Sequence, residues 1–152
     1  MSTKNRVPKH TNEEINQEIH QRTVRNLQFY LQHPEQIPTR LQELDEEWDI
    51  ERVLETNAAG LSLAGLILGL TVNRRWLLLP LTVQLFFMQH ALQGWCPPLP
   101  ILRRLGVRTA DEINYERYAL KAIRGDFKDL TAKGELPGAE QDSDKILRAM
   151  MH

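Results

Sequence analysis

An almost uncharged stretch of 47 residues runs from Thr56 to Leu102, and its only charges are Arg74 and Arg75. Two segments, 57–73 and 76–95, flank these arginines, and each is apolar around the whole circumference of a helix. Helices of this kind are buried in a large core or in lipid. The flanks offer only modest amphipathic helices to build a core. We therefore expect an all-α chain in which residues 57–100 form a transmembrane helical hairpin flanked by N- and C-terminal amphipathic helices.

The length of the first apolar segment argues against a simple span. Its apolar part, residues 58–72, contains 15 residues, which is about 22 Å of helix at ~1.5 Å per residue. The hydrocarbon core of a bilayer is about 30 Å thick. The hairpin would then cross a thin or locally thinned bilayer. The alternatives are a re-entrant loop, or burial of both helices inside a protein or a soluble oligomer.

The flanks divide into three further regions. Residues 1–56 carry 7 basic and 11 acidic side chains, and apolar spacing predicts an acidic arm of two helices. The second of these, 39–55, has a strongly acidic face, which is a solvated surface or a docking strip for a basic cytoplasmic protein. Residues 101–125 are predicted to be a basic, amphipathic helical region. It consists of a short helical turn over 101–106, ended by Gly106, and a helix over 110–124 between a Thr109–Glu112 capping box and Gly125. Residues 126–152 are predicted to be a flexible tail with a weak terminal helix.

Several side chains near the ends of the apolar segments are of the types found at membrane interfaces. Aromatic and basic residues collect there because one end of each side chain is apolar and the other is wet. The candidate interfacial anchors are Trp76, Trp95, Arg74, Arg75, Arg103 and Arg104. Gly65 and Gly69 form a G-x-x-x-G pair, with Gly60 further up the same helix. These glycines allow close helix packing, either with a second copy in lipid or within the chain's own hairpin.

Polar groups inside the second apolar segment form a second set of candidates. Gln89, His90 and Gln93 are interpreted as a hydrogen-bonded polar seam between helices, with a proton or metal position as the alternative for His90. Cys96 is the only cysteine and the one candidate reactive thiol. Arg103 and Arg104 follow it and would lower its pKa. The alternative for Cys96 is a small packing residue beside the prolyl turn.

The charge distribution indicates where the chain sits. An even number of spans places both flanks on one side of the membrane. Counting arginines near the helix ends gives Arg52, Arg103, Arg104 and Arg108 on that side against Arg74 and Arg75 in the loop. The positive-inside rule then predicts that both termini are cytoplasmic. The formal net charge of -1 gives no electrostatic case for nucleic acid as a partner.

A family resemblance enters at Gly94-Trp95-Cys96-Pro97, together with the glycines of the first apolar helix and the Asn-Arg-Arg-Trp loop. Residues 52–110 resemble the YgaP-like two-helix inner-membrane domain, a rhodanese-associated transmembrane domain of unknown function. The resemblance implies a helical hairpin in the bacterial inner (plasma) membrane that is paired as a homodimer. No rhodanese domain precedes the hairpin here, so the sulfur chemistry of the fused members does not transfer with it.

Enzyme signatures are absent from the sequence. It has no phosphate-binding glycine loop, no G-x-S-x-G, no H-E-x-x-H and no paired cysteines, so we expect no catalysis, no cofactor and no metal. The favoured function is a non-catalytic dimerising or scaffolding module in the lipid bilayer. One alternative is a sulfur relay or persulfide carrier through Cys96 that works with a separate rhodanese-type protein. The other is a soluble helical adaptor that buries the hairpin in an oligomer.

Overall fold

The structure, a computed structural model, describes residues 6–127, and this part of the chain is helical with no strand. The all-α prediction is confirmed for these residues. The predicted terminal helix and most of the predicted tail lie outside them. In chain order the elements are α1 (Arg6–Lys9), α2 (Glu13–Gln32), η2 (Pro34–Gln36), α3 (Ile37–Glu46), α4 (Ile50–Thr71), η3 (Arg74–Leu77), α5 (Leu78–Gln93), α6 (Leu99–Arg104) and α7 (Ala110–Arg124).

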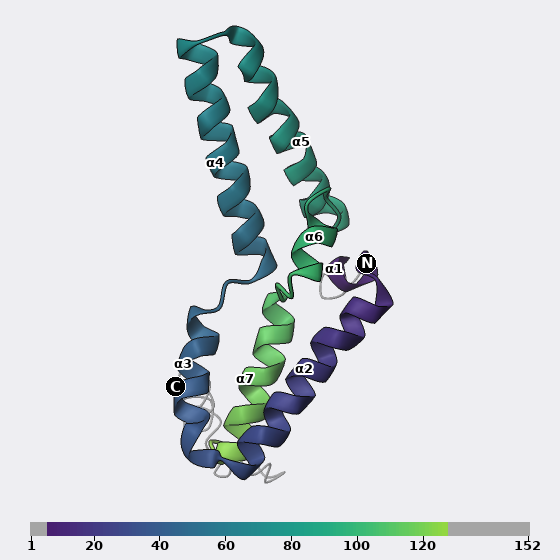
Figure 1. Cartoon of the computed structure of the whole chain (residues 1–152), viewed down its shortest axis with the longest axis vertical. Coiled ribbons are helices and arrows are strands. Elements are labelled where there is room, and N and C mark those ends of the chain that lie inside the picture. The colour runs from purple at the N-terminus through teal and green to yellow at the C-terminus, as the bar shows by residue number, and fades with distance from the viewer. Residues whose placement is uncertain (1–5, 128–152) are drawn as a thin grey trace, which may run out of the picture.

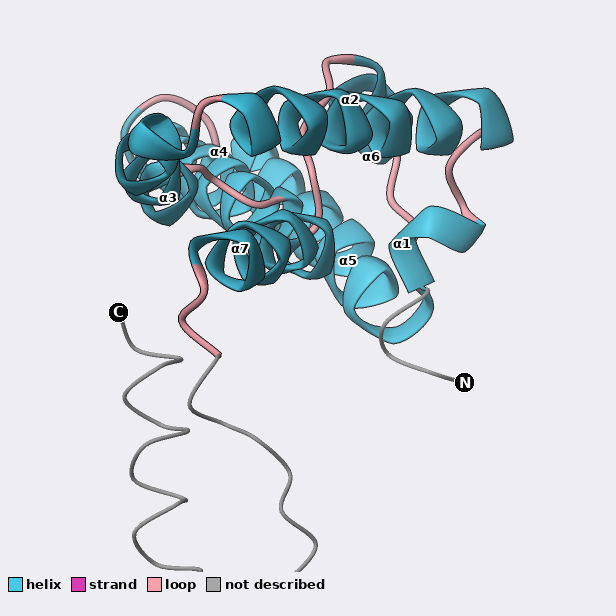
Figure 2. Cartoon of the chain, turned by 90° about the horizontal axis from the view of Figure 1, so that it is seen from below, coloured by secondary structure: helices cyan, strands magenta, loops and turns pink. Residues whose placement is uncertain are grey.

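The helices form two spatially distinct parts. Helices α2, α3 and α7 pack together into a bundle, here called the head, which Figure 2 shows from below. Helices α4 and α5 lie side by side and extend away from the head, joined at their far end by the short η3 turn (Figure 1). Helices α1 and α6 lie where the α4–α5 pair meets the head, a region called the base. The apolar helices are therefore not wrapped by the amphipathic ones.

Helix α4 starts seven residues earlier than the apolar pattern indicated. The expected acidic helix over 39–55 is wrong, because α3 ends at Glu46 and α4 begins at Ile50. Glu47 adopts an extended backbone, and the Asp49 side chain accepts a hydrogen bond of 2.7 Å from the Arg52 backbone N–H. Aspartate is a strong N-cap because it satisfies a free N–H of the first helical turn. The break at Asp49 turns the chain from the head into the α4–α5 pair.

Two glycines determine how closely α4 and α5 approach. A Cβ atom on Gly65 would lie 2.6 Å from Pro80 Cδ, and one on Gly69 would lie 2.5 Å from Leu77 Cδ2. The G-x-x-x-G pair is thus used within the chain, where it leaves no space for a larger residue. Gly60 differs, because no atom lies within 4 Å of the position of its Cβ. The expectation that Gly60 shares this packing face is wrong within one copy of the chain.

The helix predicted over 110–124 is confirmed as α7, and the short turn predicted over 101–106 is helix α6, which starts two residues earlier, at Leu99. Helix α6 is followed by Gly106 in the left-handed conformation, with φ of 80°, which glycine adopts without steric cost. Helix α7 then begins at a capping box in which the Thr109 side chain and the Glu112 side chain each bond the other's backbone N–H. Gly125, with φ of 92°, ends it. The glycine and the cap make α7 a separate element that packs on α2 and α3.

The head is held by an apolar cluster and a buried ionic network. The apolar cluster consists of Ile37, Leu41, Leu44, Ile113 and Leu120. Beside it, the fully buried carboxylate of Glu116 accepts hydrogen bonds from Arg40 Nε at 3.0 Å and from Arg108 Nη1 at 2.5 Å. Arg108 also donates to both carboxylate oxygens of Glu47, at 2.7 and 2.6 Å. Breaking one member of such a network leaves an uncompensated buried charge.

These carboxylates make the head sensitive to acid. Burial alone raises the pKa of Glu116, but the hydrogen bonds from Arg40 and Arg108 outweigh it and the net pKa is lowered. Burial likewise raises the pKa of Glu112, and the hydrogen bonds from Arg103 and Thr109 lower it overall. Glutamates with lowered pKa values bind fewer protons in the folded than in the unfolded state, so protonation favours unfolding.

We therefore expect the melting temperature of the head to be constant above the pKa of an unfolded glutamate, about 4.3, and to fall as the pH drops below that value. Circular dichroism melts of the full chain in detergent between pH 7 and pH 2.5 measure this. A Glu116→Gln variant lacks one of the titrating groups, so its melting temperature should vary less with pH. A wild-type melting temperature that stays constant to pH 2.5 would contradict the assignment.

Candidate functional site at the base of the α4–α5 pair

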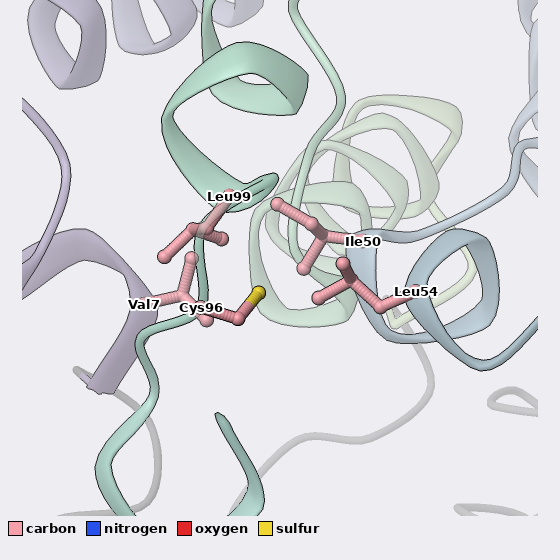
Figure 3. Packing of buried hydrophobic residues seen from close by; sticks show 5 residues of the cluster. All are labelled: Val7, Ile50, Leu54, Cys96 and Leu99. Atoms are coloured by element: carbon pink, nitrogen blue, oxygen red, sulfur yellow. The ribbon is translucent and has the colours of Figure 1, made fainter. Parts of the chain in front are cut away.

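The base is organised by a small apolar cluster that joins four segments of the chain. Its members are Val7 from α1, Ile50 and Leu54 from α4, Cys96 from the loop after α5, and Leu99 from α6. Figure 3 shows their side chains pointing toward one another. Cys96 is 3% exposed. The only thiol of the chain is therefore buried where the apolar helices α4 and α5 meet the rest of the protein, which the sequence pattern did not specify.

Polar groups adjoin this cluster on the α5 side. His90, which is 1% exposed, lies on the last turn of α5, and its Nε2 is 2.9 Å from Oε2 of Glu51 on α4. Arg6 donates through Nη2 to Oε1 of the same carboxylate at 3.1 Å, and through Nη1 to the carbonyl oxygen of Ala91 at 2.6 Å. Glu51 is thus fixed between a guanidinium and an imidazole, and α1 is tied to the end of α5.

A tight turn after α5 brings the Cys96 side chain next to the His90 ring. Gly94 ends α5 in the left-handed conformation, with φ of 79°, and its N–H donates to the His90 carbonyl oxygen at 2.7 Å. A Cβ atom on Gly94 would lie 2.5 Å from Arg6 Cβ and 2.8 Å from the Arg6 carbonyl carbon. Only glycine allows both this backbone conformation and this close approach. The left-handed turn at Gly94 thus determines the position of the Cys96 thiol two residues later.

The hydrogen bond to Glu51 assigns the histidine tautomer. A carboxylate only accepts, so Nε2 of His90 carries the proton and donates. In the neutral imidazole the other nitrogen, Nδ1, is then an acceptor, and in the charged imidazolium it is a donor. Nδ1 is buried and has no hydrogen-bond partner among the described residues, although the Cys96 side chain interacts with the ring. The base therefore brings a carboxylate, an imidazole and a thiol together in that order.

A cavity of about 180 Å³ lies between α4 and α5 next to Cys96. Its lining is almost wholly apolar and includes Leu54, Ala58, Leu61, Phe86 and Phe87. An engineered apolar cavity of roughly 150 Å³ stays dry and binds benzene, so this one is large enough for an apolar group. Leu61 and Phe86 are also exposed on the surface of the pair, which places the cavity within reach of whatever surrounds the two helices.

Beyond the base, the outer surface of the α4–α5 pair is apolar. Its exposed large side chains include Leu63, Leu66, Ile67, Leu70, Leu78, Leu81, Leu85 and Met88. Within the described residues one helix, in the range Pro34–Thr71, is long and apolar enough to cross a membrane, and only 22% of its apolar window is buried. The core helix of a soluble protein would be mostly buried. Helix α5, with 16 residues, is too short to meet the same criterion.

The predicted interfacial anchors divide into two groups. Arg74, Arg75 and Trp76 are exposed at the far end of the pair, and Arg104 is exposed at the base. The expectation for Arg103 is wrong: it is 1% exposed and donates to both carboxylate oxygens of Glu112, at 2.7 and 2.8 Å. Trp95 packs partly buried against the base cluster. An anchor that the sequence did not single out is Trp48, which is exposed at the base beneath the Arg52 guanidinium, 4.3 Å from the ring centroid.

The predicted polar seam is only partly where the sequence placed it. Gln93 is exposed and Gln89 is half-buried, whereas His90 faces Glu51. The hydrogen bond that joins the middle of the two helices is a different one, from Gln84 Nε2 to Ser62 Oγ at 3.0 Å. Gln84 and Ser62 lie 22 positions apart, and their pairing depends on the register of α4 against α5, which the apolar pattern does not reveal.

The acidic residues of the predicted docking strip are largely paired within the chain. Glu43 pairs with Arg40, Asp45 with Arg117, Glu47 with Arg108 and Glu51 with Arg6. The Asp49 carboxylate caps α4. The side chains of Glu43 and Asp45 stay 58% and 69% exposed in these pairs, so the docking strip for a basic partner stays a prediction.

No group of three or more histidine, cysteine and acidic side chains suited to a metal ion occurs within residues 6–127. Comparison of the chain with protein family models, characterised proteins and solved structures finds no match. The arguments for function below therefore stand on the residues and geometry of the chain itself.

Proposed function

We propose that this protein is a membrane anchor and scaffold, in which α4 and α5 form a transmembrane hairpin that holds the head at the surface of a lipid bilayer. The protein performs no catalysis on a soluble substrate in this role. The observation that carries the proposal is the exposed apolar surface of the α4–α5 pair beyond the base. No charged side chain occurs from Asn57 to Asn73 to make this surface soluble in water. Exposed apolar surfaces of this extent mark contacts with a membrane or another protein.

The distribution of polar groups along the pair supports lipid over a soluble partner. Charged side chains occur at both ends of the apolar zone and not between them, with Arg74 and Arg75 at the tip and Arg52 and Glu55 at the base. Trp76 and Trp48 are exposed at opposite ends. Two polar, aromatic borders around an apolar band are what a bilayer requires, whereas a soluble interface needs only one apolar face.

The apolar band is thinner than the hydrocarbon core of an ordinary bilayer, which is about 30 Å. Its 15 residues in α4 span only about 22 Å. Long arginine side chains at the tip extend the span by reaching into the headgroups, and local thinning of the bilayer absorbs the rest at modest cost. The resemblance of residues 52–110 to the YgaP-like two-helix domain likewise implies that a hairpin of this length lies in a membrane.

We further propose that the head and both termini lie in the cytoplasm of a bacterial cell. Four arginines lie near the base and two lie in the loop at the far end of the pair. The positive-inside rule counts these arginines irrespective of the ion pairs that they form after folding. Pairing into a homodimer would have to use a surface other than the Gly65–Gly69 face, since α5 already covers it.

Membrane fractionation tests the placement. We expect the protein to remain with membranes after washes in high salt and alkaline carbonate, and to be released by detergent. Release by salt alone, or a monodisperse assembly in the absence of detergent, would refute the anchor in favour of a soluble adaptor.

A charge placed on the outer face of the hairpin should prevent insertion. Leu66 is 46% exposed near the middle of the apolar band, and an arginine at the centre of a transmembrane helix costs about 3 kcal/mol. We expect Leu66→Arg to shift a large fraction of the protein out of the membrane pellet. The matched control is Leu31→Arg, at a 60% exposed leucine of α2 in the head, which should not change the partition. Equal behaviour of the two variants would contradict the proposal.

A further inference from the structure

We propose that Cys96 is a nucleophilic thiol that accepts an acyl group, with His90 as its base, Glu51 as a positioning residue and the cavity between α4 and α5 as the site for the acyl chain. The product is a thioester between Cys96 Sγ and the chain. This inference stands on the cluster and the cavity at the base, and does not require the hairpin to span a bilayer.

The first support is the order of the three side chains. A nucleophile is recognised by a base within reach, which is itself oriented by a third group. Glu51 accepts the Nε2 proton of His90 at 2.9 Å, which leaves the buried Nδ1 as the ring nitrogen available to the Cys96 side chain that interacts with the imidazole. Arg6, at 3.1 Å, holds Glu51 in place from the other side.

The second support is the chemistry of the cavity that Cys96 lines. Phenyl rings and aliphatic side chains make up its walls, and Asn57 is the one polar side chain among the lining residues. Such a lining favours a hydrocarbon chain over a charged or sugar-like group, because transfer of apolar surface out of water is the main source of binding energy. The exposed faces of Leu61 and Phe86 allow the rest of a long chain to continue along the outside of the pair.

The reaction that this arrangement supports is thioester exchange. The Cys96 thiol proton moves to Nδ1 of His90, and Sγ attacks the carbonyl carbon of an acyl thioester donor. A bond between Sγ and the carbonyl carbon forms, and the bond between that carbon and the donor sulfur breaks. The proton then passes from Nδ1 to the departing thiolate, which leaves as a free thiol. No oxidant, reductant or metal takes part.

The wild-type protein provides the first test, because Cys96 is the only cysteine and any thiol adduct identifies itself. The full chain in detergent micelles is incubated with palmitoyl-coenzyme A or, separately, with acetyl-coenzyme A, and the adduct is followed by intact-mass spectrometry. We expect palmitoyl transfer that hydroxylamine reverses and that is at least about 10-fold faster than acetyl transfer. Absence of an adduct, or equal rates for both donors, would overturn the proposal.

Substitutions distinguish general-base catalysis by His90 from a merely structural role of this residue. A general base contributes about 100-fold or more to such a step, so His90→Gln should slow palmitoyl transfer by that factor at pH 7. Glu51→Gln should slow it less. The wild-type pH profile of the rate should contain a step from titration of the imidazole, and this step should be absent in His90→Gln. Cys96→Ser should give no adduct. An unchanged rate or pH profile in His90→Gln would refute the role of the imidazole.

Filling the cavity tests the chain site without touching the three polar groups. Ala58 lines the cavity and is 8% exposed, and Ala58→Leu would occupy part of the volume. We expect this variant to lose the preference for the palmitoyl donor while it retains the slower acetyl transfer. Retention of the full chain-length preference would place the acyl chain elsewhere and overturn the proposed site.

Discussion

Replacing Glu116 with glutamine is expected to lower the free energy of unfolding of the head by about 3–5 kcal/mol, which is the usual cost of removing one partner from a buried ion pair. Glu116 is completely buried and is the carboxylate shared by Arg40 and Arg108. Glutamine preserves the shape but leaves Arg108, itself 1% exposed, with one carboxylate fewer. Denaturant titration of the full chain in detergent, followed by circular dichroism, measures the loss.

The matched control for this prediction shares a partner with Glu116. Glu43 also accepts from Arg40, at 2.9 Å, but its side chain is 58% exposed. Exposed pairs contribute about 0–1 kcal/mol, so Glu43→Gln should have little effect. A similar loss in both variants would show that burial does not determine the strength of this network.

Replacing Gly94 with alanine is expected to detach α1 from the base. The left-handed conformation alone costs an alanine about 1–2 kcal/mol. The added Cβ would also lie 2.5 Å from Arg6 Cβ, so Arg6 must move and lose its hydrogen bonds to Glu51 and to the Ala91 carbonyl oxygen. Hydrogen exchange of the α1 and α5 ends, read by mass spectrometry, should show strongly reduced protection around Val7 and His90.

Gly60→Ala provides the contrast for Gly94→Ala. Gly60 lies inside α4 and its added Cβ would meet no atom within 4 Å. Alanine in a helix interior is more favourable than glycine by roughly 0.5–1 kcal/mol, so this variant should be neutral or slightly stabilising. Equal loss of protection in Gly60→Ala and Gly94→Ala would mean that the effect of Gly94 does not depend on its contact with Arg6.

The parts of the fold that followed from the sequence are those determined by local pattern. The Thr109–Glu112 capping box and the glycine at 125 gave the bounds of α7, because caps and left-handed glycines act within a few residues of their own position. The uncharged stretch indicated the apolar helices for the same reason, since hydrophobicity around a helix is visible in its own residues. The start of α4 was missed because Asn57 marks the start of the uncharged segment and not of the helix, which the Asp49 cap determines.

The candidate site was only half visible in the sequence. Cys96 and His90 stood out as a lone thiol and a polar residue in an apolar helix, but nothing linked them to Glu51, 39 positions from His90. Glu51 looked like one more acid in an acidic run. A clue was available in its helical position, since a carboxylate one residue into α4 lies at the same end of the pair as a histidine on the last turn of α5.

Local sequence was enough to predict that residues 6–127 are helical and that two of the helices are apolar around their circumference, because helix propensity, caps and hydrophobicity are carried by each segment alone. The packing of the helices determined which carboxylate pairs with which cation and that Arg103 is buried rather than interfacial. It also placed a thiol, an imidazole and a cavity together where the α4–α5 pair meets the head. Those outcomes depend on the angle and register at which distant helices pack, and electrostatic pairs and cavities exist only once that packing is fixed.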